Sequence, residues 1–441
     1  MQIKGAFIFI LFFILFQHSY AQKITNSAIA EQESTRLYYT QDWKKLGVYT
    51  EKAISNGYDY YYMRMRSGIS YFEQKKYVKA IRHFQKALFF NSDTLAQEYL
   101  YYSYLFSGRV AEAKMLTKTF SDKLIKKIKP SKNKIIESIY TEGGVGLTNL
   151  ENNYQNIDID GLYDIYGEAT INKTMRYLHV GLNHQVTNNL SIYHGYSNIG
   201  IDLLRKIKFN NKDTLDSYKL TQHDYYITSN IQLKGISIAP AFHFINVGFG
   251  RLNASYNSLQ YKYIFSKKDT SFVNYVTSLA LSKSVGIFTY GLSSSYSQLN
   301  SYNQLQIGLS ASYLPLANNN LYGSTNIVLL NENNENRIII AQKLGAKIIS
   351  RLWAEAGITY GNLQNYNENN AFVVFNTGDK ILYKYGVALI APFHKNIELS
   401  IRYDRFNRES TYYRMNNLLN IEPVTVNYNT QTIVGGIKCT F

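Results

Sequence analysis

The chain has 441 residues and a formal net charge of +16, from 47 lysines and arginines against 31 aspartates and glutamates. Its single cysteine, Cys439, excludes a fold held together by disulfides within one chain. Beyond the amino-terminal stretch, no segment of the sequence approaches the ~18 continuous apolar residues of a transmembrane helix. Residence in a membrane would therefore require a closed β-barrel.

The amino terminus has the features of a secretory signal peptide. Lys4 precedes an apolar run at residues 6–16, and Ser19 and Ala21 supply the small residues of a cleavage site. The run is too short to span a bilayer as a helix, and no cysteine stands at the cut to indicate a lipoprotein. We therefore expect residues 1–21 to be removed and the mature chain to act outside the cytoplasm, away from nucleic acid.

Residues 22–130 have a helical period and carry 19 lysines and arginines against 10 aspartates and glutamates. Small and aromatic residues recur there at the spacing with which two antiparallel helices pack closely. The best-formed copy contains Gly68, Tyr71, Tyr77, Ala80, Phe84 and Ala87. This pattern resembles a tetratricopeptide repeat, with a more degenerate copy on either side. The resemblance implies about three stacked helical hairpins whose concave face docks a protein; a spacer or support is the alternative.

From residue 131 to residue 441 the period of the apolar residues changes to two. Leu305, Ile307 and Leu309, for example, alternate with polar residues and glycine. Such runs predict fourteen strands, approximately at residues 135–149, 174–186, 190–201, 219–233, 235–247, 272–284, 286–299, 303–315, 320–330, 336–347, 351–362, 379–391, 396–408 and 426–441.

The connections between these strands alternate in length, with the exception of the seventh and ninth, which are odd-numbered but short. The long ones are all odd-numbered, at residues 151–173, 202–218, 248–271, 363–378 and 409–425. This alternation is typical of an outer-membrane barrel, with loops outside the cell and tight turns in the periplasm. A soluble β-sandwich would alternate along its strands but would not predict the alternating connections. We expect an α plus all-β chain in the outer membrane: a periplasmic helical array, then an antiparallel transmembrane β-barrel of about 14 strands at residues 131–441.

The period of two also assigns charged side chains to the lumen. Ile381, Ile397, Leu399 and Ile401 would face lipid, whereas charges on four neighbouring strands would point inward. The inward group comprises Lys343, Lys347, Glu355, Lys384, Glu398, Arg402 and Asp404. It would line the path of a hydrophilic or charged substrate; alternatively, these residues form ion pairs across strands that stiffen the wall.

The sequence contains no known arrangement of catalytic residues or metal ligands. His223 and Asp224 are adjacent but lie on opposite faces of a strand, so neither can serve the other. His179 faces inward with no predicted carboxylate on its own strand, while His184 and His194 face outward. The G-x-S-x-G and H-E-x-x-H motifs and clusters of Cys and His are absent. We expect no enzyme activity, no cofactor and no metal.

The last nine residues, IVGGIKCTF, continue the alternation. Gly436, Cys439 and Phe441 stand where the carboxyl-terminal strand signal of outer-membrane barrels carries its glycine and two apolar residues. The resemblance implies recognition by the barrel assembly machinery, with this strand pairing with the first and removing both sheet edges. Cys439 is therefore expected to face lipid rather than to act as a reactive thiol.

The order of signal peptide, helical repeats and barrel resembles that of exopolysaccharide export porins, YaiO-type barrels and surface lipoprotein assembly modifiers. Apart from the repeat residues and the last strand, the resemblance extends only to domain order and pattern. It implies export or translocation of a polymer, either a polysaccharide or a polypeptide, across the outer membrane, with a periplasmic protein bound to the repeats. The alternative function is a non-conducting anchor that recruits envelope proteins through its repeats or loops.

Overall fold

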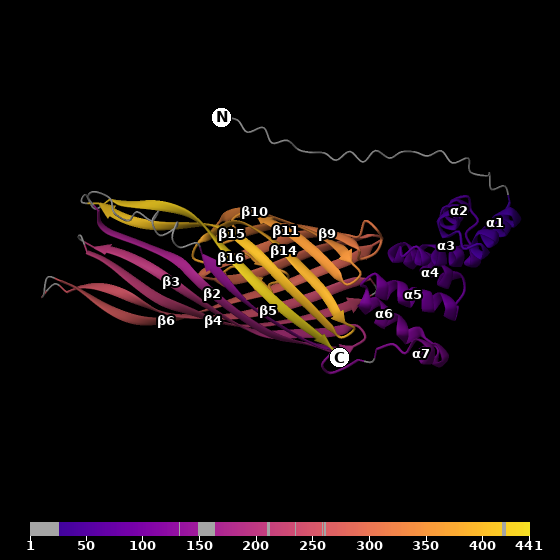
Figure 1. Cartoon of the computed structure of the whole chain (residues 1–441), viewed down its shortest axis with the longest axis horizontal. Helices are drawn as coiled ribbons and strands as arrows, with labels where there is room; N and C mark the ends of the chain where they lie inside the picture. Colours follow the sequence, from indigo (N-terminus) through magenta and orange to yellow (C-terminus); the bar gives the residue numbers. More distant parts are fainter. Residues whose placement is uncertain are drawn as a thin grey trace, which may run out of the picture.

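The computed structural model describes residues 26–131, 133–148, 164–209, 212–233, 235–257, 259, 262–416 and 420–441. An amino-terminal helical domain stands at one end of an elongated β-barrel, and the carboxyl terminus lies at the same end (Figure 1). The expected signal peptide at residues 1–21 lies outside the described residues. No helix in the described part of the chain is long and apolar enough to cross a membrane.

The helical domain is a series of short helices in which consecutive helices pack against each other. They are α1 (Ser27–Tyr39), α2 (Trp43–Ser55), α3 (Tyr61–Glu73), α4 (Tyr77–Phe90), α5 (Thr94–Phe106), α6 (Val110–Leu116), a 3-10 turn (Thr117–Thr119) and α7 (Asp122–Ile128). The side chains of Asn26, Asp42, Asp93 and Ser121 accept hydrogen bonds from first-turn backbone N–H groups of α1, α2, α5 and α7. These caps explain where the four helices begin.

The repeat residues lie where α3 packs against α4. A Cβ added to Gly68 would stand 2.5 Å from the ring of Phe84, so only glycine allows this approach. Ala80, Phe84 and Ala87 are fully buried, and Tyr71 belongs to the same apolar cluster. These five residues therefore hold the two helices together, whereas helix contacts alone do not define a tetratricopeptide fold.

Fourteen antiparallel strands close into a barrel, which confirms the predicted fold class. They are β1 (Ser138–Thr148), β2 (Asp164–Thr187), β3 (Leu190–Phe209), β4 (Lys212–Leu233), β5 (Ile236–Asn257), β6 (Lys262–Val285), β7 (Phe288–Leu299), β8 (Tyr302–Tyr313), β9 (Leu321–Glu332), β10 (Glu335–Ile349), β11 (Leu352–Tyr360), β14 (Lys380–His394), β15 (Ile397–Asn416) and β16 (Ile421–Thr440). β1 pairs with β16 from Ser138 opposite Thr440 to Thr148 opposite Thr430, so the closing seam involves the first and last strands.

Three connections predicted to be long loops are mostly strand. Residues 202–218, 248–271 and 409–425 are largely the outer parts of β3 to β6, β15 and β16, which run 20–24 residues each. These outer parts project beyond the other strands at the end opposite the helices (Figure 1). Apolar and polar residues do not alternate regularly there, because neither face of a projecting ribbon is fixed against an apolar environment.

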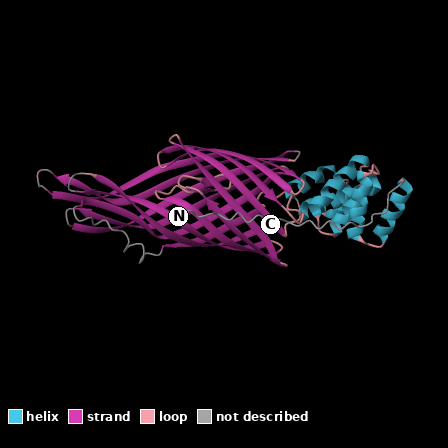
Figure 2. Cartoon of the chain, turned by 90° about the horizontal axis from the view of Figure 1, so that it is seen from above, coloured by secondary structure: helices cyan, strands magenta, loops and turns pink. Residues whose placement is uncertain are grey.

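The helical domain stands at one end of the barrel (Figure 2), where hydrogen bonds join it to two separate turns. The backbone N–H of Val78 donates to the carbonyl of Ala317 in the β8–β9 turn at 3.0 Å. At the β2–β3 turn, Asn188 Nδ2 donates to the carbonyl of Lys114 at 3.1 Å. Lys114 also forms an ion pair with Glu137, just before β1. The domain thus spans part of the barrel mouth at the end with the short turns.

Candidate functional site: a loop across the barrel lumen

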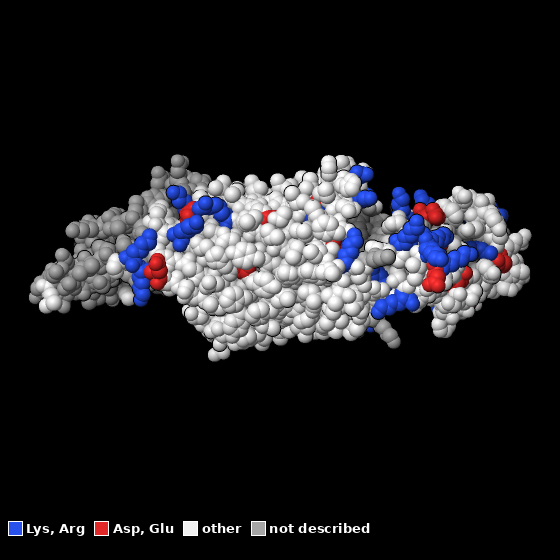
Figure 3. Space-filling model, turned by 90° about the horizontal axis from the view of Figure 1, so that it is seen from below, with Lys and Arg blue, Asp and Glu red and all other residues white. Residues whose placement is uncertain are grey.

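The outer and inner faces of the barrel wall differ in chemistry. Large apolar side chains are exposed around the outside, among them Leu309 (62%), Ile338 (63%) and Ile401 (51%). Figure 3 shows the middle of the barrel nearly free of charged residues on the visible face, while lysines and arginines gather on the helical domain and toward the opposite end. An exposed apolar band of this extent is typical of a surface that contacts lipid or another protein.

The connection between β11 and β14, residues 361–379, folds into the lumen. It contains a two-residue ribbon of β12 (Asn367–Glu368) and β13 (Val373–Val374). Its two ends lie against the near wall, where the N–H of Leu363 donates to the carbonyl of Ile381 at 2.8 Å. The rings of Tyr366 and Phe375 stack with centroids 6.1 Å apart. These four side chains form a buried apolar cluster with Leu330 and Ile339 of the wall.

The middle of this loop reaches the opposite wall. β4 is seven strands from β11 in either direction around the barrel of fourteen. Tyr226 of β4 donates a hydrogen bond to the carbonyl of Asn370 at 3.0 Å, and His243 Nδ1 of β5 lies 2.7 Å from the carbonyl oxygen of Ala371. The ring of Phe372 lies 5.2 Å from the ring of Tyr226. The loop therefore crosses the lumen and is held on both sides.

Polar contacts hold the stretch between the two walls. Asn300 Nδ2 donates to Asn365 Oδ1 at 2.9 Å, and Asn367 Nδ2 donates to Ser295 Oγ at 3.0 Å. All of the loop's contacts with the wall are noncovalent, because the chain has no second cysteine to form a disulfide. A solute that crosses the barrel must pass beside this loop or displace it.

A cavity of about 540 Å³ remains beside the loop. Five of the seven sequence-predicted lumen residues line it: Lys343, Glu355, Lys384, Arg402 and Asp404. Lys343 Nζ lies 3.5 Å from Glu355, and Arg402 Nε lies 2.9 Å from Asp404. The charges brought together here are paired across or along the strands, so the cavity wall has both signs without a large excess of either.

Among the five cavity residues, Lys384 also forms an ion pair with Glu368 and so ties β14 to the inserted loop. The two remaining predicted lumen residues lie outside the cavity lining. Lys347 Nζ lies 4.8 Å from the ring centroid of Trp353, outside the cavity lining. Glu398 is exposed and also outside that lining. The predicted patch is thus one cluster around the loop plus two residues apart from it.

Ile381 points inward, which corrects the prediction that it faces lipid. It is fully buried under the loop. The pairing of β14 with β15 shifts register between Ile381 and Tyr383, and an irregularity of this kind reverses the side-chain phase on one side of it. Beyond the shift the prediction holds, since Val387 is 55% exposed and Lys384 lines the cavity.

The inward histidine does not complete a catalytic arrangement of the familiar kind. His179 is fully buried, with Nδ1 2.8 Å from Ser197 Oγ and Nε2 2.6 Å from the Tyr193 hydroxyl. Both ring nitrogens of His179 therefore contact hydroxyl groups, and neither contacts the carboxylate that a catalytic triad would place there. Asp224 is buried on the inner face, whereas the adjacent His223 contacts an outward tyrosine. Within the described ranges, no three His, Cys, Asp or Glu side chains are placed to hold a metal ion.

Several polar residues of the cavity are not among the predicted lumen residues. Glu142 of β1 accepts hydrogen bonds from Tyr140 and from Tyr177, the latter at 2.6 Å. Asp224 and His243 also line the cavity, and one buried side-chain atom of each has no hydrogen-bond partner among the described residues. These residues could have been identified from the sequence, because they lie at inward-facing positions of their strands. The apolar run AFVVF within an asparagine-rich connection could have indicated that this loop packs against the wall.

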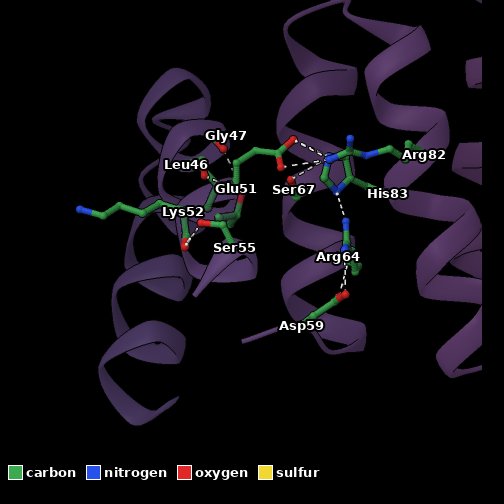
Figure 4. Close-up of polar contacts among 11 residues, drawn as sticks. Leu46, Gly47, Glu51, Lys52, Ser55, Asp59, Arg64, Ser67, Arg82 and His83 are labelled. Carbon is green, nitrogen blue, oxygen red and sulfur yellow. Dashed lines mark hydrogen bonds and ion pairs between the residues drawn. The ribbon is translucent and has the colours of Figure 1, made fainter. Parts of the chain in front are cut away.

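A polar network is buried between α2, α3 and α4 (Figure 4). His83, 1% exposed, lies with Nε2 3.0 Å from Glu51, and Arg64 donates to its Nδ1 at 3.3 Å. Burial lowers the pKa of His83, and the hydrogen bond with His83 lowers the pKa of Glu51. The hydrogen bond from Arg64 likewise lowers the pKa of Asp59. His83 contacts Glu51 directly and is linked to Asp59 through Arg64, and these contacts join α2, α3 and α4.

Comparisons with known proteins give only distant structural likenesses. No protein-family model and no curated protein sequence matches it. Solved structures with similar barrels include a Pseudomonas aeruginosa FadL homologue (TM-score 0.45, 8% identity, 69% of this chain and 90% of that chain). Another is the Pseudomonas putida toluene transporter TodX (TM-score 0.44, 8% identity, 69% of this chain and 90% of that chain). A third is the Acinetobacter baumannii outer membrane protein Omp33 (TM-score 0.32, 6% identity, 70% of this chain and 99% of that chain). These likenesses are too distant to carry an argument about function. By its own fold, the chain is a closed 14-stranded β-barrel with a loop across the lumen and an amino-terminal helical domain.

Proposed function

We propose that this protein is an outer-membrane barrel that translocates a polymer, a polysaccharide or a polypeptide, with loop 361–379 as the gate of the lumen. The observation that carries the proposal is the loop's attachment to the far wall. It is held there by noncovalent contacts of three consecutive residues, Asn370 to Phe372, and such contacts can be broken and remade. The polar, charge-paired wall behind it suits a hydrophilic substrate.

The membrane assignment rests on the wall. Apolar side chains exposed on the outside and polar side chains inside are the arrangement that a bilayer requires of a spanning barrel. In the proposed orientation the short turns and the helical domain face the periplasm, and the projecting strands face outward. The barrel assembly machinery would recognise the last strand, β16.

The helical domain would supply the partner-binding part. Its helices pack in series beside the barrel mouth, where a protein bound to them would stand next to the path of the substrate. We propose a periplasmic protein as that partner. No catalytic step is part of the proposal.

A planar-bilayer recording tests the translocation proposal. Replacing residues 364–376 with a short glycine–serine segment should produce a large, steady conductance where the native barrel conducts rarely. As a matched control, cysteines at Ser295 and Asn367, whose side chains are 3.0 Å apart, should lock the loop in a C439S background until reductant is added. If neither the native nor the loop-less barrel conducts, translocation is refuted.

The second candidate is a non-conducting anchor. The same loop favours this function, because a closed barrel would have a lumen crossed from wall to wall. It would also have a mouth partly covered, as the helices cover this one. In that case the loop-less barrel would remain silent in bilayers. Cross-linking of the full chain in envelopes would still recover specific proteins on the helical domain.

A further inference from the structure

One continuous surface at the helical end of the barrel, which we call the rim patch, has both basic and apolar side chains. It comprises the exposed residues of 123–131 and 133–135, the β10–β11 turn at Arg351, the β14–β15 turn at residues 393–395, and Phe441. Figure 1 places α7 beside this end of the barrel, near the carboxyl terminus. The patch therefore follows the rim where the apolar outer wall ends.

Backbone contacts make the rim patch continuous. The linker after α7 joins the sheet at Glu137, whose N–H donates to the carbonyl of Asn183 at 2.8 Å. The N–H of Phe441 donates to the carbonyl of Glu137 at 2.9 Å. The N–H of Thr440 donates to the carbonyl of Asn396 in the β14–β15 turn at 2.8 Å. A side-chain hydrogen bond joins the β10–β11 turn, from Arg351 Nη1 to the carbonyl of Phe393 at 3.5 Å. The position of the linker relative to the rim is thus set by the sheet.

The cations of the rim patch are not paired with acids. Lys123, Lys126, Lys129, Lys134, Arg351 and Lys395 are exposed, and none of the six forms an ion pair within the described ranges. The neighbouring Lys127, by contrast, lies 2.5 Å from Glu98. The nearby Glu98 and Glu137 form ion pairs with Lys127 and Lys114, respectively. Asp122 at the start of α7 and the terminal carboxylate of Phe441 offset part of this charge. The six cations still outnumber these two acids, and an excess of this kind attracts anions.

Apolar side chains stand among these cations with large exposed fractions. Ile135 is 87% exposed, Phe393 70% and Phe441 53%, and Ile125 on α7 is 39% exposed. The backbone of Ile135 lies on the outer side of the barrel, since its carbonyl oxygen lies 2.6 Å from Nδ1 of His184. The ring of His184 stacks on His194, which contacts the exposed Tyr225 on the outer wall. Cations interleaved with exposed apolar groups at the edge of an apolar wall are typical of residues at a lipid headgroup boundary.

We propose that the rim patch binds the headgroups of anionic phospholipids in the leaflet on the helical side and fixes α7 to the membrane surface. The inference rests on the proposal that the barrel spans the outer membrane. A lipid surface fits better than an acidic protein because the exposed isoleucine and phenylalanine side chains continue the outer wall, where lipid would already be present. The contact would hold the helical domain in one position over the barrel mouth.

The test uses the full chain with Cys439 replaced by serine and Ile125 replaced by cysteine, labelled with an environment-sensitive dye. The barrel is inserted in nanodiscs of phosphatidylcholine alone or mixed with phosphatidylglycerol. We expect a blue shift of the dye only with phosphatidylglycerol, and its loss in high salt. Because each basic residue near an anionic surface contributes roughly fivefold to affinity, K123Q/K126Q/K129Q should weaken phosphatidylglycerol binding by roughly a hundredfold.

A matched triple variant controls for net charge. K44Q/K45Q/K52Q removes the same charge from α2, away from the rim, and should retain the dye shift. Equal dye emission in both lipids, or equal loss in both triple variants, would overturn the proposal. A shift produced by soluble polyglutamate but not by phosphatidylglycerol would overturn it in favour of an acidic protein. A chain that does not enter nanodiscs at all would instead refute the membrane proposal.

Discussion

Replacing Phe372 with alanine should loosen the inserted loop at the far wall. The ring of Phe372 lies 5.2 Å from those of His179 and Tyr226 and 6.2 Å from that of Tyr193. Each such aromatic contact contributes roughly 0.5–1.5 kcal/mol beyond its buried area. Because the contacts share one ring and are not additive, we expect a loss of about 2–3 kcal/mol from the attached state of the loop.

This loss converts directly into a population of the detached loop. Since about 1.4 kcal/mol is a factor of ten, the detached state should become roughly 30- to 150-fold more populated. The hydrogen bonds to the carbonyls of Asn370 and Ala371 remain in the variant, so the loop should detach transiently rather than permanently. The barrel ladder itself does not involve Phe372, and its unfolding should not change.

Two measurements check this expectation. Amide hydrogen exchange at residues 364–376 should accelerate by the same factor, and openings in planar bilayers should become correspondingly more frequent. Phe393→Ala is the matched control, because it is the same substitution at a side chain that is 70% exposed on the rim and does not contact the loop. Exchange and opening frequency within twofold of the native protein would refute the assignment of Phe372 as the far-wall attachment.

Three further predictions concern other parts of the chain. Gly68→Ala places a Cβ 2.5 Å from the Phe84 ring and should destabilise the helical domain by about 1–3 kcal/mol. Thermal unfolding followed by circular dichroism measures this loss, and an unchanged midpoint would contradict the packing of α3 against α4. The hydrogen bond from Arg66 lowers the pKa of Glu31 from 4.5 to about 2, so its stabilising effect should be complete above pH 4.5 and disappear as the pH falls through 2. The helical signal of Glu31→Gln should lack this acid-dependent component, and an identical acid titration would show that the pair is not formed. Phe441→Ala should lower the yield of inserted barrel without altering the conductance of the barrels that do insert, and a normal outer-membrane yield would refute the assembly-signal interpretation.

Much of the architecture could be predicted from local patterns. The change of period near residue 131 separates helices from strands, and the number of strands follows from runs of alternation. Ile401 and Leu399 face outward because a strand alternates its side chains whatever its neighbours are. Five predicted inward charges, such as Arg402 and Asp404, line the lumen cavity for the same reason.

The errors and omissions have equally definite causes. Ile381 was assigned to the wrong face because a register shift depends on how β14 pairs with β15, which no property of β14 alone reveals. The projecting parts of β3 to β6 lack a regular alternation, so these outer parts could not be recognised as strand from the sequence. Asp224 and His243 line the cavity, and the contact of His243 with Ala371 joins residues far apart in the sequence, so local patterns do not reveal it.

The sequence by itself determined the classes of element, their order and the side of the wall on which most side chains lie, because these depend on neighbours within a few residues. Only the tertiary structure decided that residues 361–379 enter the lumen and reach β4 and β5, and that the helical domain spans the mouth. Both arrangements join residues more than a hundred positions apart in the sequence, such as Tyr226 and Asn370. Whether such contacts form depends on barrel closure, which brings opposite walls within reach of a single loop.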